Sequence, residues 1–283
     1  MPKRRQKKKS RTRERFEALT ASLARKIETE GAGIVARAAA QVLINLRGSF
    51  SPTNVVMIAA QYPAATRVQG YRAWEKEGYP VRKGEHAIWI FAPRFGKKED
   101  SEEDGEDGAE LELKGFITVP VFDIAQTTAP PEAYSTPDMR IRGAVDLGSA
   151  VRAISNTIAP VELLPTSHRR LQGFYNPKEH RIVLYAAPDA VRLHTLLHEA
   201  AHALLHHNRE GANTAQVERE AELTAYLAGS VLGLEGLDKS STYYLTSYTK
   251  EPAELFAALK RSATAAVKIL EVVEGSSELQ KAA

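Results

Sequence analysis

The sequence contains no cysteine, and this absence narrows the chemistry that the chain can perform. Disulfide frameworks, thiolate metal sites, iron–sulfur clusters and cysteine nucleophiles are all excluded. Any metal that the chain binds must therefore be held by histidine, aspartate or glutamate. The absence of cysteine also fits a reducing compartment.

Long apolar runs are missing as well. The longest stretch without a charged residue, Gly48–Thr66, contains Pro52 and Pro63, so it is unlike the roughly 20 apolar residues of a membrane-spanning helix. The basic N-terminus is followed by Glu14 and Glu17 rather than by an apolar segment, which argues against a secretory signal. We therefore expect no membrane partner and a cytoplasmic location.

What the chain does have is charge, and this charge is segregated. Residues 1–15 hold nine bases and one acid, whereas residues 99–112 hold nine acids and no base. Blocks of like charge repel themselves and stay unfolded. We therefore expect a disordered basic arm over 1–15 and a solvated acidic loop over 97–112. The arm either attracts nucleic acid or serves only as a solubilising tail.

Apolar spacing and turn residues predict an α+β fold in two domains. Hydrophobic residues make up 43% of the 283 residues, which is enough to bury a sizeable core. The N-terminal domain is expected over 16–126, with helices followed by strands on either side of the acidic loop. A Pro-rich linker is expected over 127–140. The C-terminal domain, 141–283, is expected to hold a hairpin that turns at Asn176-Pro177 and helices over 150–158, 188–208, 214–232 and 254–273.

The clearest chemical signal is the run His198-Glu199-Ala200-Ala201-His202. On a helix, residues four apart share one face, so both imidazoles can reach one cation. Glu199 lies next to the first ligand, where it can act as a general base toward a metal-bound water. His194 and His206 extend the four-residue ladder, but the pairs that they form have no acid at the equivalent position. Only His198 and His202 give two ligands and a base.

A catalytic zinc site needs a third protein ligand, and the next predicted helix offers one. Glu218 and Glu222 share a face of that helix, whereas Glu220 points elsewhere. We expect Glu218 to be the third ligand and Glu222 to orient a ligating histidine. The reverse assignment of these two carboxylates stays open. His206 and His207, at the C-terminus of the first helix, are expected to face solvent.

Residues 67–98 interleave bases with aromatic side chains. Single-strand binders use cations to follow phosphates and aromatic faces to stack on bases. We therefore predict contacts with single-stranded DNA from Arg67, Tyr71, Arg72, Trp74, Arg82, Lys83 and Arg94. Non-specific binding of this kind should weaken steeply as salt is added.

The C-terminal residues resemble a known peptidase family. The segment 196–207 around the HExxH motif, followed by Glu218-Arg219-Glu220-Ala221-Glu222, is similar to the zinc peptidase domain of the ImmA/IrrE group, which has a zincin fold. In that group a Glu-x-x-Ala-Asn/Asp motif follows HExxH, and its glutamate binds zinc. The resemblance implies Glu218 as this ligand, while Glu222 stands where the family has Asn or Asp.

The N-terminal half carries a second resemblance. Its residues are similar to the single-stranded-DNA-binding domain of ArdC-type antirestriction proteins at Trp74, Gly78, Val81, Lys83-Gly84-Glu85, the strand Ile88–Ala92, Val121-Phe122-Asp123 and Gln126-Thr127. Proteins of that family join such a domain to a C-terminal metallopeptidase-like domain, which is the order found here. The resemblance implies a role in protecting incoming mobile DNA from restriction, or in cutting a regulatory protein in a defence or stress circuit.

The leading hypothesis is a protein that binds single-stranded DNA and uses Zn²⁺ to hydrolyse a peptide bond in a protein substrate of unknown identity. One alternative is a DNA-binding protein with a structural zinc and no peptidase activity. A second alternative is a peptidase whose basic arm binds acidic partners. Hydrolysis also needs an oxyanion donor, and Tyr243, Tyr244 or Tyr248 can supply one.

Overall fold

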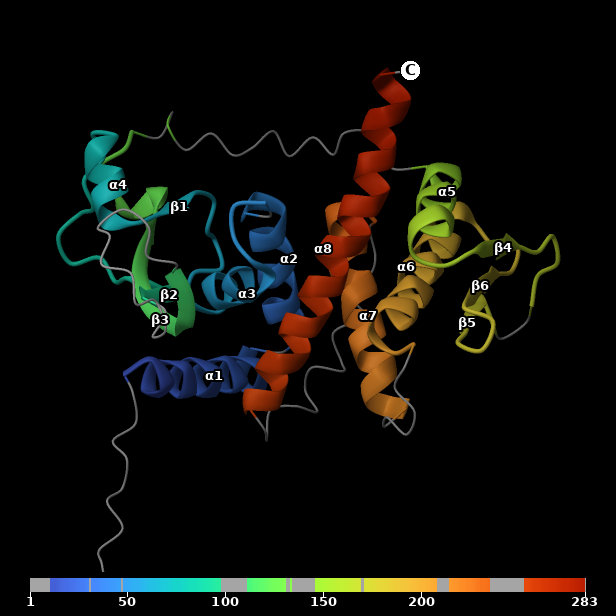
Figure 1. The fold of residues 1–283 in the computed structure, drawn as a ribbon, viewed down its shortest axis with the longest axis horizontal. Coiled ribbons are helices and arrows are strands. Elements are labelled where there is room, and N and C mark those ends of the chain that lie inside the picture. The colour runs from blue at the N-terminus through green and yellow to red at the C-terminus, as the bar shows by residue number, and fades with distance from the viewer. Residues whose placement is uncertain are drawn as a thin grey trace, which may run out of the picture.

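The computed structural model shows an α+β fold, as predicted, in which a helical middle separates two three-stranded sheets (Figure 1). The structure describes residues 11–30, 32–46, 48–97, 111–130, 133, 146–168, 171–207, 214–234 and 252–282. The first part of the predicted basic arm, most of the acidic loop and most of the linker lie outside the described residues, at 1–10, 98–110, 131–132 and 134–140.

Three helices open the N-terminal half: α1 (Arg11–Glu30), α2 (Ala32–Leu46) and α3 (Pro52–Gln61). The prediction of a disordered arm over 1–15 is therefore wrong for residues 11–15, which are helical. Arg15 gives the physical reason, because its guanidinium lies 3.5 Å from the centre of the Trp89 ring and donates to the Thr118 hydroxyl at 3.0 Å. These contacts attach the basic start of α1 to the neighbouring sheet.

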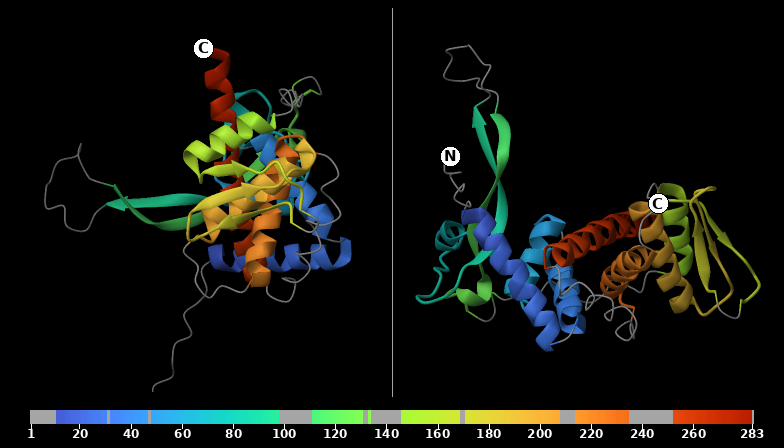
Figure 2. Two further views of the ribbon diagram at one scale, coloured as in Figure 1. Left: turned by 90° about the vertical axis from the view of Figure 1, so that its right-hand side faces the viewer. Right: turned by 90° about the horizontal axis from the view of Figure 1, so that it is seen from below.

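The N-terminal sheet contains β1 (Val68–Gln69), β2 (Ile88–Lys97) and β3 (Leu111–Asp123) in the order β1-β3-β2, with the helix α4 (Tyr71–Lys76) between the first two strands. The predicted pairing across the acidic loop is confirmed, because β2 and β3 are antiparallel from the pair Ile88/Val121 to the pair Lys97/Leu111. They form a long ribbon that projects from the rest of the molecule (Figure 2).

Two amide side chains of α3 complete the exposed edge of β2. Asn54 donates to the Phe91 carbonyl at 2.9 Å and accepts from the Phe91 N–H at 2.9 Å. Gln61, two turns further along α3, makes the same pair of bonds with Trp89, both at 2.9 Å. The two amides act as a short substitute strand, which satisfies backbone groups that an edge strand otherwise leaves open.

The C-terminal half begins with α5 (Leu147–Thr157), followed by β4 (Val161–Leu163), β5 (Gly173–Asn176) and β6 (Arg181–Leu184). The predicted hairpin is the antiparallel pair β5/β6, while β4 was not predicted and pairs with β6 in parallel. The sheet order β4-β6-β5 leaves β5 at an edge. Three helices follow, α6 (Asp189–Leu205), α7 (Thr214–Val231) and α8 (Pro252–Ala282).

One hydrophobic core joins the two halves. The last helix, α8, packs on α1 and α3 as well as on α5, α6 and α7, and α2 packs on α7. The predicted linker also begins later than residue 127, because Thr127 pairs with Val81 and Ala129 is buried in a small cluster around Trp74. Among the described helices, none is long and apolar enough to cross a membrane.

Candidate metal centre

The HExxH motif lies on α6, whose other faces anchor it in the core. Leu193, Leu196, Leu197 and Ala200 are buried at helical spacing, which turns the ring of His198 and that of His202 toward α7. Leu204, one turn beyond this stripe, is 38% exposed, because α6 ends at Leu205. The structure thus places the motif at the contact between α6 and α7.

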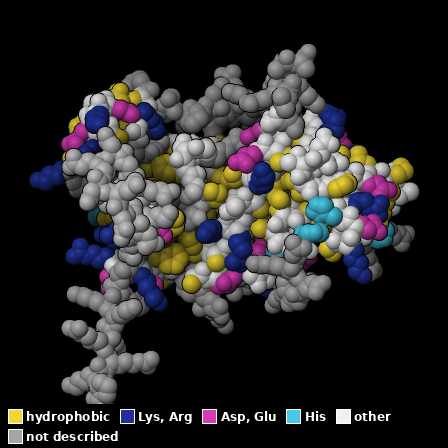
Figure 3. All heavy atoms as spheres, viewed as in Figure 1, with side chains coloured by type: hydrophobic (Ala, Val, Ile, Leu, Met, Phe, Trp, Pro, Cys, Tyr) yellow, Lys and Arg dark blue, Asp and Glu magenta, His cyan; other side chains and the backbone are white. Residues whose placement is uncertain are grey.

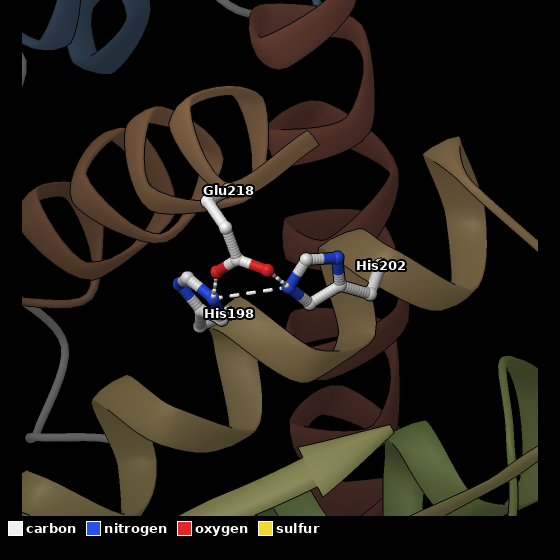
Figure 4. Close-up of side chains that lie close together, drawn as sticks. All are labelled: His198, His202 and Glu218. Atoms are coloured by element: carbon white, nitrogen blue, oxygen red, sulfur yellow. Dashed lines mark hydrogen bonds and ion pairs between the residues drawn. The ribbon is translucent and has the colours of Figure 1, made fainter. Parts of the chain in front are cut away.

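His198, His202 and Glu218 converge, and their ligand atoms all lie within 4.8 Å of one another (Figure 4). The Nε2 atoms of the two imidazoles are 3.1 Å apart. The Glu218 carboxylate faces both, at 3.3 Å from His198 Nε2 and 3.6 Å from His202 Nε2. Within the described part of the chain, these three side chains form the group that can hold a metal ion.

Glu222 approaches His198 from the other side of the ring. Its carboxylate lies 3.0 Å from His198 Nδ1, while Glu218 meets Nε2. An imidazole whose Nδ1–H is held by a carboxylate presents its Nε2 lone pair to a metal. This geometry favours Glu218 as the ligand and Glu222 as the orienting group, rather than the reverse.

The carboxylates also control protonation at this centre. Burial by itself lowers the pKa of His198, but hydrogen bonds to Glu218 and Glu222 outweigh burial and raise that pKa to about 10. The same bonds, from His198 and then from His202, hold the pKa of the Glu218 carboxyl well below its usual range. Without a metal, a proton therefore takes the place of the cation between these groups.

Glu199 lies on the inner side of the centre and is 8% exposed. Burial raises the pKa of its carboxyl, and the neighbouring His198 and His202 partly offset this effect. The backbone N–H of Tyr175, in the edge strand β5, donates a hydrogen bond to the Glu199 carboxylate. A buried carboxylate with a raised pKa beside a metal site is suited to accept and release a proton.

A cleft of about 450 Å³ opens in front of this centre, between β5 and the facing sides of α6 and α7. Gly173 permits the close approach of β5 to β6 and α6, because a Cβ atom at this position would lie 2.7 Å from the Val183 carbonyl oxygen and 2.8 Å from the Thr195 methyl. Tyr243, Tyr244 and Tyr248, the predicted sources of an oxyanion donor, lie outside the described residues.

A ring cluster that was not predicted fixes β5 to the end of α6. Tyr175 contacts the Nδ1 atoms of both His180, at 2.7 Å, and His207. His180 Nε2 lies 2.9 Å from the Ile158 carbonyl, which only accepts, so in the neutral ring Nδ1 accepts from the Tyr175 hydroxyl. His180 adopts a φ of 48°, a rare conformation for a residue with a side chain. His207 lies 32 residues after Tyr175 in the sequence, which is why local spacing did not reveal the cluster.

The prediction that His206 faces solvent is wrong. Its side chain is 6% exposed and lies 3.9 Å from Glu220, which is 1% exposed. Glu220 in turn accepts from the guanidinium of Arg261 on α8, which lies against this part of α7. A buried charge on α7 needs a counter-charge, and the packing of α8 brings the guanidinium of Arg261 to it.

The structure separates the predicted DNA contacts into a buried side chain, two side chains in ion pairs and four other exposed side chains. Trp74 is fully buried and donates to the Phe122 carbonyl at 2.9 Å, so its assignment as a contact is wrong. Arg67 pairs with Glu77 at 2.8 Å, and Arg82 pairs with Glu85 at 2.9 Å. The remaining predicted side chains are exposed, and they are Tyr71, Arg72, Lys83 and Arg94.

Several motif residues of the N-terminal half have a structural role. Asp123 is fully buried, and its carboxylate accepts from the backbone N–H groups of Thr66, Arg67 and Ala125. Gln126 closes the same turn by accepting from the Asp123 N–H at 2.9 Å. The Val-Phe-Asp and Gln-Thr motifs thus join β1 to the end of β3 and stabilise the sheet.

A family model matches the first part of the chain. Residues 6–122 match the N-terminal domain of the anti-restriction factor ArdC. An uncharacterized protein of Bacillus anthracis, pXO2-81, is 25% identical in an alignment 248 residues long that covers 73% of this chain. The chain spans 42% of the length of that relative.

Two solved structures share the fold of the whole chain. The metal-free crystal structure of the antirestriction protein ArdC from plasmid R388 has a TM-score of 0.65 and 21% identity, covering 93% of this chain and 98% of that one. The Mn(II)-bound structure of the same protein has a TM-score of 0.62 and 22% identity, covering 92% and 97%. Residues 6–122 are therefore similar to the N-terminal domain of ArdC, and the chain shares the fold of the ArdC antirestriction protein over 93% of its length.

Proposed function

We propose that the chain is an antirestriction protein of the ArdC type that binds single-stranded DNA and carries a metal-dependent peptidase centre. The observation that carries the catalytic part is the convergence of His198, His202 and Glu218 beside the buried Glu199. The match of residues 6–122 to the ArdC N-terminal domain supports the DNA-related part. Protection of incoming DNA from restriction takes place in the cytoplasm, where we expect the protein to act.

The donor set fits zinc best. Two imidazoles and one carboxylate, with an open side toward a cleft, are typical of catalytic zinc sites, which keep one position for water. Manganese is the ion named for the solved ArdC structure, so a harder divalent cation is a second candidate for the same three ligands. When bound, either ion supplies a Lewis acid that polarises a carbonyl and acidifies water.

The protein groups then have distinct tasks. Glu199, whose pKa is raised by burial, accepts a proton from the attacking water and returns it to the leaving amine. Glu222 holds the Nδ1–H of His198 and keeps that ring in the tautomer that leaves Nε2 free for the ion. The cleft runs beside the edge strand β5, where an extended peptide can add as a further strand. These features support the similarity to zinc peptidases of the ImmA/IrrE group.

Glu199→Gln tests the peptidase proposal against a structural metal. We expect the full-length variant to keep one equivalent of zinc, measured by mass spectrometry, and to lose the hydrolysis of denatured casein by roughly 100-fold or more. His202→Ala serves as the control, because it should lose both the metal and the activity. A parent protein without peptidase activity, or a Glu199→Gln variant with full activity, would leave the DNA-binding protein with a structural metal as the better description.

A further inference from the structure

A second groove, of about 1100 Å³, lies on the N-terminal side of the molecule, away from the metal cleft. The starts of α1, α3 and α8 surround it, together with the middle of the β2–β3 ribbon. Figure 3 shows hydrophobic side chains gathered in a hollow on this face, with Lys and Arg side chains close by. The proposed peptidase mechanism does not use this groove, so any function of the groove must be separate from peptide hydrolysis.

The charge of the groove is of one sign. Four cations line it, Arg13 from α1, Arg94 and Lys114 from the β2–β3 ribbon, and Lys260 from α8. None of the described residues that line it is acidic. Two of the cations pair with acids that do not line the groove, Arg13 with Glu17 at 3.0 Å and Lys114 with Glu112 at 2.8 Å. Exposed pairs of this kind are weak, so a polyanion can compete for both cations.

The floor of the groove is aromatic. Phe16, Phe50, Phe91 and Phe116 all line it, and Phe116 is 59% exposed. Aromatic faces bind the flat faces of bases, and a base offers its face only where it is unstacked. Cations that surround an aromatic floor therefore favour a single strand over a duplex.

An irregularity in the ribbon shapes this side of the groove. Arg94 pairs with Gly115, but Phe95 pairs with Leu113, so the ladder skips Lys114. Gly115 has a φ of 128°, which lies outside the range that side chains readily adopt. Such a bulge bends a strand and redirects its side chains. Lys114 and Phe116, on either side of Gly115, both line the groove.

We propose that single-stranded DNA occupies this groove, with bases stacked on Phe116 and the deeper phenylalanines and with phosphates held by Arg94, Lys114 and Lys260. The inference rests on the proposed single-strand binding and assigns its surface. Of the seven contacts predicted from the sequence, Arg94 alone lines the groove. Since Phe256 and Lys260 come from α8, both halves of the chain form the binding surface.

Fluorescence anisotropy of the full-length protein with a labelled oligothymidylate, and with its duplex, tests this assignment. We expect Phe116→Ala to weaken single-strand binding roughly 5- to 100-fold. The pair Arg94→Gln and Lys260→Gln should reduce the slope of log K against log salt by about 1.4, or 0.7 for each phosphate contact. The matched control pair, Arg25→Gln and Lys178→Gln, removes two exposed cations that neither line the groove nor belong to the seven predicted contacts, so its binding should equal that of the parent.

The outcomes separate the two proposals. Groove variants that bind single-stranded DNA like the parent would overturn the groove while keeping single-strand binding. A parent that binds no single strand would overturn both. All four changed positions and Phe116 are exposed, so the fold should survive, and an unchanged circular dichroism melting curve for each variant checks this.

Discussion

At the scale of single residues, Glu222 shows how a carboxylate outside the metal-binding group can control the centre. Its oxygen lies 3.0 Å from His198 Nδ1, and its side chain is 11% exposed. Removal of such an orienting carboxylate typically lowers metal affinity by about 10- to 100-fold. We expect this loss for Glu222→Ala, measured by competition with a chelator. Glu162→Ala, which removes a surface carboxylate paired with Arg181, should leave the affinity unchanged.

The protonation of His198 leads to a second prediction at this scale. Its pKa is raised to about 10 in the metal-free protein, so the ring carries a proton at neutral pH. A metal must displace that proton, and the competition grows as the pH falls. Metal affinity should therefore rise with pH, by up to about tenfold per unit below pH 10.

Calorimetry in buffers of different ionisation enthalpy measures the proton directly. We expect the release of about one proton for each metal bound at neutral pH. The same binding enthalpy in every buffer would show that His198 is already neutral, and would contradict the role given to Glu218 and Glu222. Glu222→Gln should release fewer protons than the parent, because one of the groups that raise the His198 pKa is then uncharged.

At the scale of elements, a buried ion pair links α7 to α8. Glu220 is 1% exposed, and Arg261 supplies two nitrogens to the same carboxylate oxygen. Loss of the arginine would break this buried ion pair, and breaking a buried pair by removing one partner typically costs about 3–5 kcal/mol. We expect Arg261→Met to lower the free energy of unfolding by that amount in urea titrations.

A compensating double variant and a control variant test this prediction further. The double variant Glu220→Gln and Arg261→Met should recover much of the stability, because the buried carboxylate charge of Glu220 is removed together with its guanidinium partner. Arg192→Met, which breaks the pair with the exposed Asp189, should cost less than about 1 kcal/mol. Equal losses in the free energy of unfolding for Arg261→Met and Arg192→Met would show that the buried pair between α7 and α8 stabilises the protein no more than an exposed pair does.

At the scale of the whole molecule, α8 makes the two halves interdependent. Phe16 of α1 packs edge-on against Phe256 of α8, with ring centres 5.1 Å apart, and α3 packs on the same helix. A chain that ends at residue 140 would leave these apolar faces of α1 and α3 in water. We expect such a fragment to bind the dye ANS and to melt without a cooperative transition, whereas the full chain should melt cooperatively. A sharp melting transition of the fragment would show that the N-terminal half folds alone.

Much of the metal centre was predictable from sequence because its geometry is local. Four-residue spacing on one helix brings His198 and His202 to the same face, and the same rule pairs Glu218 with Glu222. The strands on either side of the acidic loop and the hairpin β5/β6 were predictable for a similar reason, because alternation and turn residues act over short distances. The absence of cysteine had already left only imidazole and carboxylate ligands.

The tertiary structure decided which faces of the helices and strands are buried, and the predictions that failed concern burial. Trp74 was assigned to DNA and is buried, and His206 was assigned to solvent and lies against Glu220. The groove gathers its cations from α1, the β2–β3 ribbon and α8. Spacing along one helix or strand specifies the direction of a side chain relative to its neighbours, but burial depends on elements that arrive from distant parts of the chain. For this protein the most distant of these is α8, which closes the core of both halves.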